Sequence, residues 1–80
     1  MPELQLTRLP RKQKRLLTTL ARVTSTIPDG QRFTESQIND HLRPIYADYA
    51  LLRRLLIDYH FLARTPDGTA YWRLAPERTA

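Results

Sequence analysis

The residues of this chain whose type and spacing best suit a chemical task are arginines, and the task is contact with an anion. Arg53 and Arg54 stand side by side in a segment whose apolar residues recur at helical spacing. A guanidinium can bind a phosphate, or O6 and N7 of guanine in the DNA major groove. In the alternative, structural interpretation, Arg54 pairs with Asp58 and Arg53 braces Asp48 or a carbonyl of the preceding helix, for about 0.2–0.5 kcal/mol per pair. Both interpretations stay open.

A run of basic side chains precedes the first predicted helix. Positive charge near a helix N-terminus opposes the helix dipole by roughly 0.3–1 kcal/mol per charge, so polyanion contact is favoured over a merely solvated helix start. Arg64 and Arg73 flank a predicted hairpin, where they either contact phosphates or stay solvated. The predicted nucleic-acid-binding residues are Arg11, Lys12, Lys14, Arg15, Ala50, Arg53, Arg54, Arg64 and Arg73.

Composition narrows the functional classes. The 80 residues carry a net charge of +5 and no cysteine, which excludes disulfides and thiolate metal sites. His41 and His60 are the two histidines, and no group of residues has metal-ligand spacing. We find no nucleophile–base pair and no glycine-rich phosphate loop, so we expect neither an enzyme nor a cofactor. No apolar run is long enough for a membrane span, and we expect a cytoplasmic protein without a membrane partner.

The positions of these residues depend on three predicted helices and a hairpin. Helical spacing predicts helices over residues 11–26, 34–42 and 48–59. Thr34 and Gln37 form a capping-box pattern, and Asp48 is a plausible N-cap. Residues 61–65 and 69–74 read as strands joined by a turn at 66–68, and residues 31–33 as a possible short third strand. We predict a flexible N-terminal arm over residues 1–9, a domain over 10–75 and a frayed tail over 76–80.

The faces of these elements can also be predicted. In the third helix one face should be buried (Leu52, Leu55, Leu56 and Tyr59), and the opposite face should be exposed (Ala50, Arg53, Arg54 and Ile57). In the last strand Ala70, Trp72 and Leu74 alternate with Tyr71 and Arg73, so we expect Trp72 to pack inward.

The order helix, short strand, helix, helix, hairpin predicts an α+β winged helix-turn-helix with three helices and a C-terminal two-stranded β-hairpin wing. In that architecture the third helix can enter the major groove while the hairpin flanks it. One feature argues against a module that simply recognises a DNA base sequence through its third helix. Asp48 and Asp58 cancel the charge of the two arginines in that helix. Ala50 and Ile57 would touch a thymine methyl or mark a protein contact surface.

Three segments of the sequence also resemble a known protein family. The segments KQKRLLTTL, RFTESQINDHL and DYALLRRLLIDYHFLARTPDGTAYWRL resemble family 2087 of the domains of unknown function, over roughly residues 9–74. The resemblance implies a winged-helix-like fold and a link to transcriptional regulators, with no established activity. The family motif falls on Asp48, Tyr49, Leu52, Arg53, Arg54, Asp58, Tyr59, Leu62, Arg64, Asp67, Gly68, Tyr71 and Trp72.

This sequence departs from the family pattern at His60, where glycine is usual. That position is the expected C′ residue of the third helix, which often adopts a left-handed conformation, so we expect a strained but intact turn. The function we expect is double-stranded DNA binding by a transcriptional regulator, with a homodimer or a regulatory protein as a possible partner. The alternative is a winged-helix protein-interaction module that does not contact nucleic acid.

Overall fold

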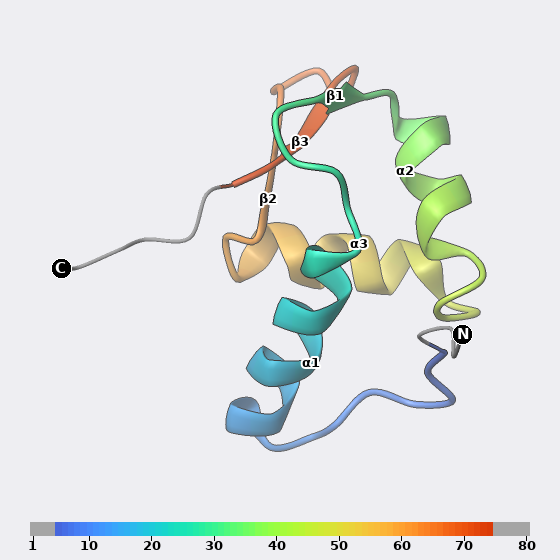
Figure 1. Ribbon diagram of the computed structural model, residues 1–80, viewed down its shortest axis with the longest axis vertical. Helices are drawn as coiled ribbons and strands as arrows, with labels where there is room; N and C mark the ends of the chain where they lie inside the picture. Colours follow the sequence, from blue (N-terminus) through green and yellow to red (C-terminus); the bar gives the residue numbers. More distant parts are fainter. Residues whose placement is uncertain (1–4, 75–80) are drawn as a thin grey trace, which may run out of the picture.

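The computed structural model describes residues 5–74, and within them the chain forms three helices and a small sheet (Figure 1). The elements are α1 (Gln13–Ser25), β1 (Arg32–Phe33), α2 (Glu35–Leu42), α3 (Tyr49–Asp58), β2 (Leu62–Arg64) and β3 (Tyr71–Arg73). This α+β, winged-helix-like arrangement confirms the predicted fold class. Residues 1–4 of the predicted arm and the predicted tail at 76–80 lie outside the described residues.

The sheet consists of the hairpin strands β2 and β3 and the short strand β1. Its strand order is β1-β3-β2, and both pairings are antiparallel. Arg32 and Ala63 both lie opposite Trp72, while Phe33 and Arg64 both lie opposite Tyr71. The predicted third strand is therefore present, and it places the chain segment before α2 beside the hairpin.

Capping side chains set the starts of α2 and α3. The Thr34 hydroxyl accepts from the Gln37 amide at 3.1 Å, and the Gln37 side chain accepts from the Thr34 amide at 2.8 Å. The Asp48 carboxylate accepts from the Leu51 amide at 3.2 Å. Both predicted caps are confirmed. A side-chain cap of this kind typically stabilises a helix by about 1 kcal/mol relative to alanine.

Helix α1 begins two residues later than predicted, at Gln13 rather than Arg11. Its N-cap residue is Lys12, whose side chain makes no capping hydrogen bond, and its first turn contains no acidic residue. Because Lys12 has no acceptor to offer the first-turn amides, the helix starts without the stabilisation that α2 and α3 receive.

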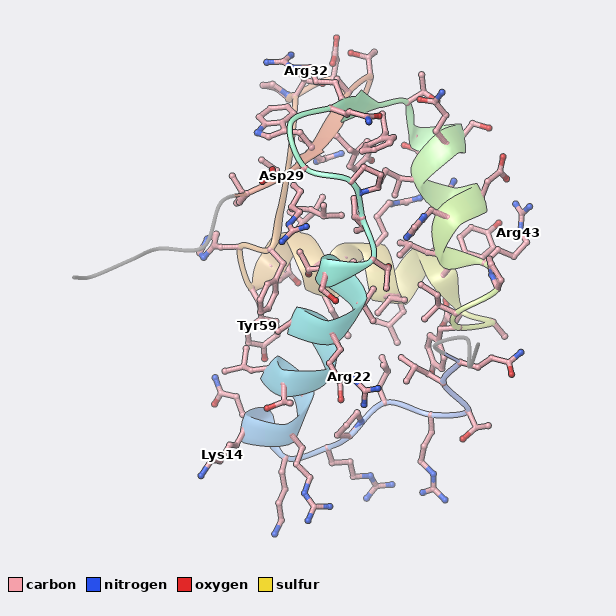
Figure 2. All side chains as sticks on the ribbon, viewed as in Figure 1. Lys14, Arg22, Asp29, Arg32, Arg43 and Tyr59 are labelled. Carbon is pink, nitrogen blue, oxygen red and sulfur yellow. The ribbon has the colours of Figure 1, made fainter. Side chains whose placement is uncertain are left out.

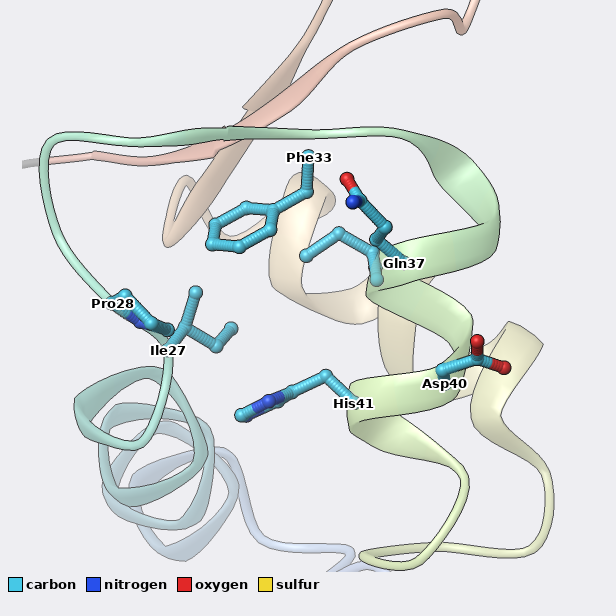
Figure 3. A pocket seen from close by; sticks show the side chains of 7 residues that line it. Ile27, Pro28, Phe33, Gln37, Asp40 and His41 are labelled. Carbon is cyan, nitrogen blue, oxygen red and sulfur yellow. The ribbon is translucent and has the colours of Figure 1, made fainter.

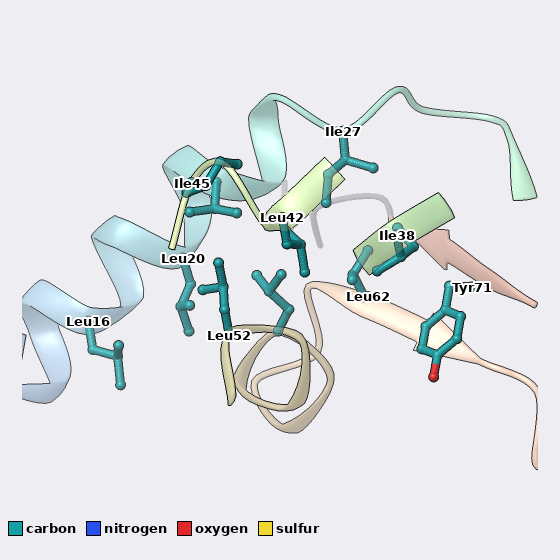
Figure 4. Close-up of a cluster of buried hydrophobic side chains, with 11 residues drawn as sticks. Leu16, Leu20, Ile27, Ile38, Leu42, Ile45, Leu52, Leu62 and Tyr71 are labelled. Atoms are coloured by element: carbon teal, nitrogen blue, oxygen red, sulfur yellow. The ribbon is translucent and has the colours of Figure 1, made fainter. Parts of the chain in front are cut away.

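The core lies where α1, α2 and α3 meet the inner face of the sheet (Figure 4). Leu20, Val23, Leu42, Leu52 and Leu56 have no exposed surface. Each fully buried aliphatic side chain stabilises the fold by roughly 1.5–3 kcal/mol before conformational entropy is subtracted. In α3 the predicted buried face is confirmed at Leu52 and Leu56, whereas Leu55 and Tyr59 are half-buried.

The prediction for the last strand was wrong. Tyr71, rather than Trp72, packs inward and is only 1% exposed, while Trp72 is half-buried on the other face. The Arg32 guanidinium lies over the Trp72 ring, 4.6 Å from its centre. Side chains alternate along a strand, so the pairing of Tyr71 with Phe33 fixes every other side chain of β3 as well. Ala70 and Leu74 are half-buried too, and neither belongs to the buried core.

The join between α3 and β2 is left-handed at His60, as expected. His60 has φ of 66° at the C′ position. Its amide donates to the Ile57 carbonyl at 3.0 Å, and the Phe61 amide donates to the Leu56 carbonyl at 2.8 Å. These two bonds form a Schellman motif, so the carbonyls of Leu56 and Ile57 are satisfied although histidine replaces glycine.

The segment before α1 packs against the domain. The backbone amide of Leu6, in the segment predicted as an arm, donates to the Ile45 carbonyl at 2.6 Å, and Leu6 and Leu9 pack against the core.

Across residues 5–74, every helix is too short or too polar to cross a membrane.

Candidate nucleic-acid interface

Three of the predicted arginines surround one hollow between the start of α2, the C-terminal half of α3 and the hairpin. We call it the arginine hollow. Its volume is about 330 Å³. The residues that line it are Glu35, Arg53, Arg54, Ile57, Asp58, Arg64 and Tyr71. The fold thus brings side chains up to 36 residues apart in the sequence to one surface. This surface lies beside α3, the helix that the sequence analysis expected to face DNA.

Arg54 is the most accessible arginine of α3. Its side chain is 79% exposed, and its Nε lies 3.7 Å from Oδ2 of Asp58. An exposed pair one helical turn apart contributes about 0.3–0.5 kcal/mol, so the guanidinium can leave Asp58 for a ligand at small cost. The pairing named as the structural alternative is present, and it is too weak to hold Arg54 in place.

Arg53 has a different environment. It is half-buried, its Nη1 donates to Oδ1 of Asn39 on α2, and its guanidinium lies over the Tyr71 ring, 5.9 Å from the centre. The structural partner is therefore the Asn39 side chain, not Asp48 or a backbone carbonyl. Because this contact joins α2 to α3, Arg53 has a structural role that Arg54 lacks.

The hairpin side of the hollow is organised around Glu35. The buried Tyr71 hydroxyl donates to Oε1 of Glu35 at 3.1 Å. A methyl group built onto Gly68 would lie 3.4 Å from Nη1 of Arg64 and 3.9 Å from Oε1 of Glu35. The turn of the hairpin thus packs beside both side chains, and Arg64 itself is exposed.

The exposed face predicted for α3 is only partly present. Ala50 and Arg54 are exposed, as predicted, whereas Arg53 and Ile57 are half-buried. Leu51, which the sequence did not single out, is 40% exposed.

The N-terminal basic run, which we define as Arg11, Lys12, Lys14 and Arg15, is exposed throughout. It lies at the start of α1, at the opposite end of the molecule from the hairpin (Figures 1 and 2). The longest dimension of the molecule is 34 Å. The fold therefore keeps the basic run and the arginine hollow apart rather than joining them in one patch.

Arg73 is held by the protein itself. Its Nη1 donates to the carbonyl oxygen of Ile27 at 3.0 Å, and the side chain is half-buried. Its Nε is buried and has no hydrogen-bond partner. Arg73 lies outside the arginine hollow and fastens the chain between α1 and β1 to the sheet, so the solvated arginine of the alternative interpretation is not what is found.

A second, more apolar hollow of about 290 Å³ lies between the end of α1 and α2 (Figure 3). Thr26 donates its hydroxyl proton to the Val23 carbonyl at 2.6 Å, so its oxygen accepts from Nε2 of His41 at 2.9 Å. Partial burial lowers the pKa of His41, because desolvation disfavours the imidazolium. The hydrogen bond to Thr26 thus places a proton on Nε2 of His41. Among the described residues, no three His, Cys, Asp or Glu side chains lie close enough together to hold a metal ion.

Sequence reasoning missed two residues of the site, Asn39 and Glu35. Neither was singled out, although each contacts a side chain of the hollow. The Arg32–Trp72 stack on the outer face of the sheet was also missed. The usable signal was the alternation of Arg32 with the apolar Phe33, which places Arg32 on the face away from the core.

Comparison with known proteins yields one family. The family model DUF2087, described as an uncharacterized protein conserved in bacteria, matches residues 5–73. Neither curated proteins nor solved structures gave a match.

Proposed function

Because the chain belongs to the DUF2087 family of uncharacterized bacterial proteins, whose description names no activity, we propose from the geometry that it binds double-stranded DNA as part of a transcriptional regulator. The observation that carries the proposal is the convergence of Arg53, Arg54 and Arg64 on one hollow at the junction of α3 and the hairpin. In a DNA-binding protein of this architecture, the third helix can enter the major groove while the hairpin flanks it.

The N-terminal basic run supplies the second contact. Its four cations are exposed and stand at a helix start that has neither a capping side chain nor an acidic residue. Helix N-termini favour anions, and basic side chains favour phosphates through the release of counterions. Because the run lies at the start of α1, away from the hairpin, it would contact phosphates outside the part of the duplex that faces the hollow.

A domain of this size binds DNA weakly on its own, so a homodimer or a regulatory protein partner completes the proposal. Two copies would then contact half-sites separated by about one helical turn. We place this activity in the cytoplasm.

A second candidate function is a protein-interaction module. Leu51 is 40% exposed on α3, and Trp72 is half-buried on the outer face of the sheet beneath Arg32. Aromatic and arginine side chains are enriched in protein interfaces. Such a module would use these surfaces and leave the arginine hollow free.

Fluorescence anisotropy with labelled random duplex DNA tests the proposal at low and moderate salt. We expect micromolar binding that weakens steeply with salt and is competed by unrelated duplex DNA. Arg54→Gln should weaken binding more than Arg22→Gln, which removes one charge from an exposed position on α1. Equal effects of the two variants would show that net charge, rather than the hollow, carries the binding. Absence of binding at low salt would refute the proposal and favour the interaction module.

A further inference from the structure

The arginine hollow combines hydrogen-bond donors and acceptors, and this combination distinguishes it from the N-terminal basic run. Arg53, Arg54 and Arg64 provide donors, while Glu35 and Asp58 provide carboxylate acceptors. Resting on the proposed DNA binding, we propose that this hollow reads the major-groove edge of a G·C base pair. Arg54 donates to guanine, and Glu35 accepts from cytosine.

The charges of the hollow suit a base better than a phosphate. Arg53 is bound to Asn39, and Asp58 lies 3.7 Å from Arg54. The two carboxylates offset the charge of two of the three arginines, so the hollow attracts a phosphate less than the start of α1, whose first turn has basic residues and no acidic ones. We therefore assign the phosphate contacts to the basic run. The hollow suits a ligand that carries both hydrogen-bond acceptors and a hydrogen-bond donor.

A G·C pair is such a ligand. In the major groove guanine presents two acceptors, O6 and N7, and cytosine presents an N4 amino donor. Arginine binds the two guanine acceptors with two parallel hydrogen bonds, and a carboxylate accepts from the cytosine amino group. An A·T pair is read mainly by the side-chain amide of Asn or Gln. The amide oxygen of Asn39 already accepts from Arg53, so that alternative is weaker here.

Glu35 is positioned for this role by a buried side chain. Tyr71 is 1% exposed, and its hydroxyl donates to Oε1 of Glu35 at 3.1 Å. Fixing one carboxylate oxygen orients the other and lowers the entropy lost on binding. Arg54 and Asp58 lie one turn apart on α3, and their exposed 3.7 Å pair is weak enough for a base to replace the carboxylate.

Selection of bound sites from a random duplex pool tests the inference, with three variants that each remove one negative charge. They are Glu35→Gln, Asp58→Asn and the control Asp40→Asn, whose carboxylate pairs with Arg43 at 3.0 Å on α2 and does not line the hollow. All three should raise affinity for random duplex, and Glu35→Gln and Asp58→Asn should raise it more than Asp40→Asn, because their carboxylates line the hollow. We expect wild type and Asp40→Asn to select at least one fixed G·C pair, preferred roughly 5- to 150-fold over the other pairs. Glu35→Gln should lower that preference to roughly half of the wild-type value or less.

Tyr71→Phe separates positioning from charge, since it keeps the Glu35 carboxylate but removes the hydrogen bond that orients it. It should weaken the G·C preference without raising affinity for random duplex, and it serves as the test if Glu35→Gln fails to fold. Duplex binding with no preferred pair, or an equal loss of preference in Asp40→Asn, would overturn the inference and leave DNA binding intact. Failure of the wild type to bind any duplex would instead overturn the proposed function.

Discussion

The adjacent arginines of α3 should have different effects when each is replaced by alanine: Arg53→Ala should lower stability, and Arg54→Ala should weaken DNA binding. Arg53 would lose a charge-assisted hydrogen bond to Asn39 and its position over the Tyr71 ring. Hydrogen bonds to charged groups contribute about 1.5–3 kcal/mol and cation–π contacts about 0.5–1 kcal/mol. Since Arg53 is half-buried, we take a loss near the lower end, about 2 kcal/mol. That loss corresponds to a fall in Tm of roughly 8–16 °C for a domain of this size.

Arg54→Ala should behave in the opposite way. Its 3.7 Å pair with Asp58 is exposed and contributes about 0.5 kcal/mol at most, so Tm should fall by less than about 4 °C. If Arg54 contacts guanine, the loss of that contact costs about 1–3 kcal/mol of binding free energy. Duplex binding should therefore weaken roughly 5- to 150-fold, measured well below the melting temperature of both variants.

Differential scanning fluorimetry and anisotropy titration together check these expectations. Asn39→Ala is the matched control, because it removes the partner of Arg53 and leaves both arginines in place. In a double-mutant cycle, Arg53→Ala and Asn39→Ala should be strongly non-additive in stability. Additive losses, or an unchanged Tm in Arg53→Ala, would refute the structural role of Arg53. A large fall in Tm for Arg54→Ala would refute its assignment as a free ligand-binding side chain.

Three further predictions concern the rest of the molecule. Replacing the four residues of the N-terminal basic run by glutamine should flatten the slope of log K against log salt by roughly three to four units, and an unchanged slope in anisotropy titrations would remove the run as a phosphate contact. Arg73→Met should lower Tm through loss of the hydrogen bond to Ile27, without a selective effect on DNA binding; a loss of binding at unchanged Tm would place Arg73 in the interface. The folded-state pKa of His41 is lowered, so the unfolded chain binds its proton more readily. Stability from this group is thus present above pH of about 6.5 and is lost as pH falls through the folded pKa, and His41→Gln should flatten Tm against pH in that acidic window.

Much of the architecture could be predicted because it depends on local chemistry. The capping box at Thr34 and the N-cap at Asp48 each fix a helix start within a few residues of sequence. The left-handed turns at His60 and Gly68 are likewise local. The start of α1 was misplaced because its N-cap, Lys12, carries no capping signal that a sequence pattern could reveal.

The candidate site was harder to predict because its contacts join distant segments. Asn39 lies 14 residues from Arg53, and Glu35 lies 36 residues from Tyr71. Nothing in the neighbourhood of either arginine distinguishes the one that is held from the one that is free. Likewise, the alternation in β3 is equally compatible with Tyr71 or Trp72 inside, and only the pairing with Phe33 on β1 decides between them. Sequence reasoning therefore found the arginines of the site, but it did not find Glu35 or the separate roles of Arg53 and Arg54.

His60 offers a test of how much strain the join between α3 and the hairpin stores. Its φ of 66° costs an L-residue about 1–2 kcal/mol relative to glycine, whereas glycine adds about 0.4–1 kcal/mol of backbone entropy to the unfolded chain. Because His60 is exposed and the Schellman bonds use only backbone atoms, the substitution His60→Gly loses no side-chain packing. We expect a net gain of about 0.5–1 kcal/mol, seen as a rise in Tm of roughly 2–8 °C. His60→Ala is the control: it removes the same imidazole but keeps the Cβ, so it should not raise Tm. A rise of equal size in His60→Ala would show that the imidazole, rather than the left-handed backbone, is what destabilises this turn.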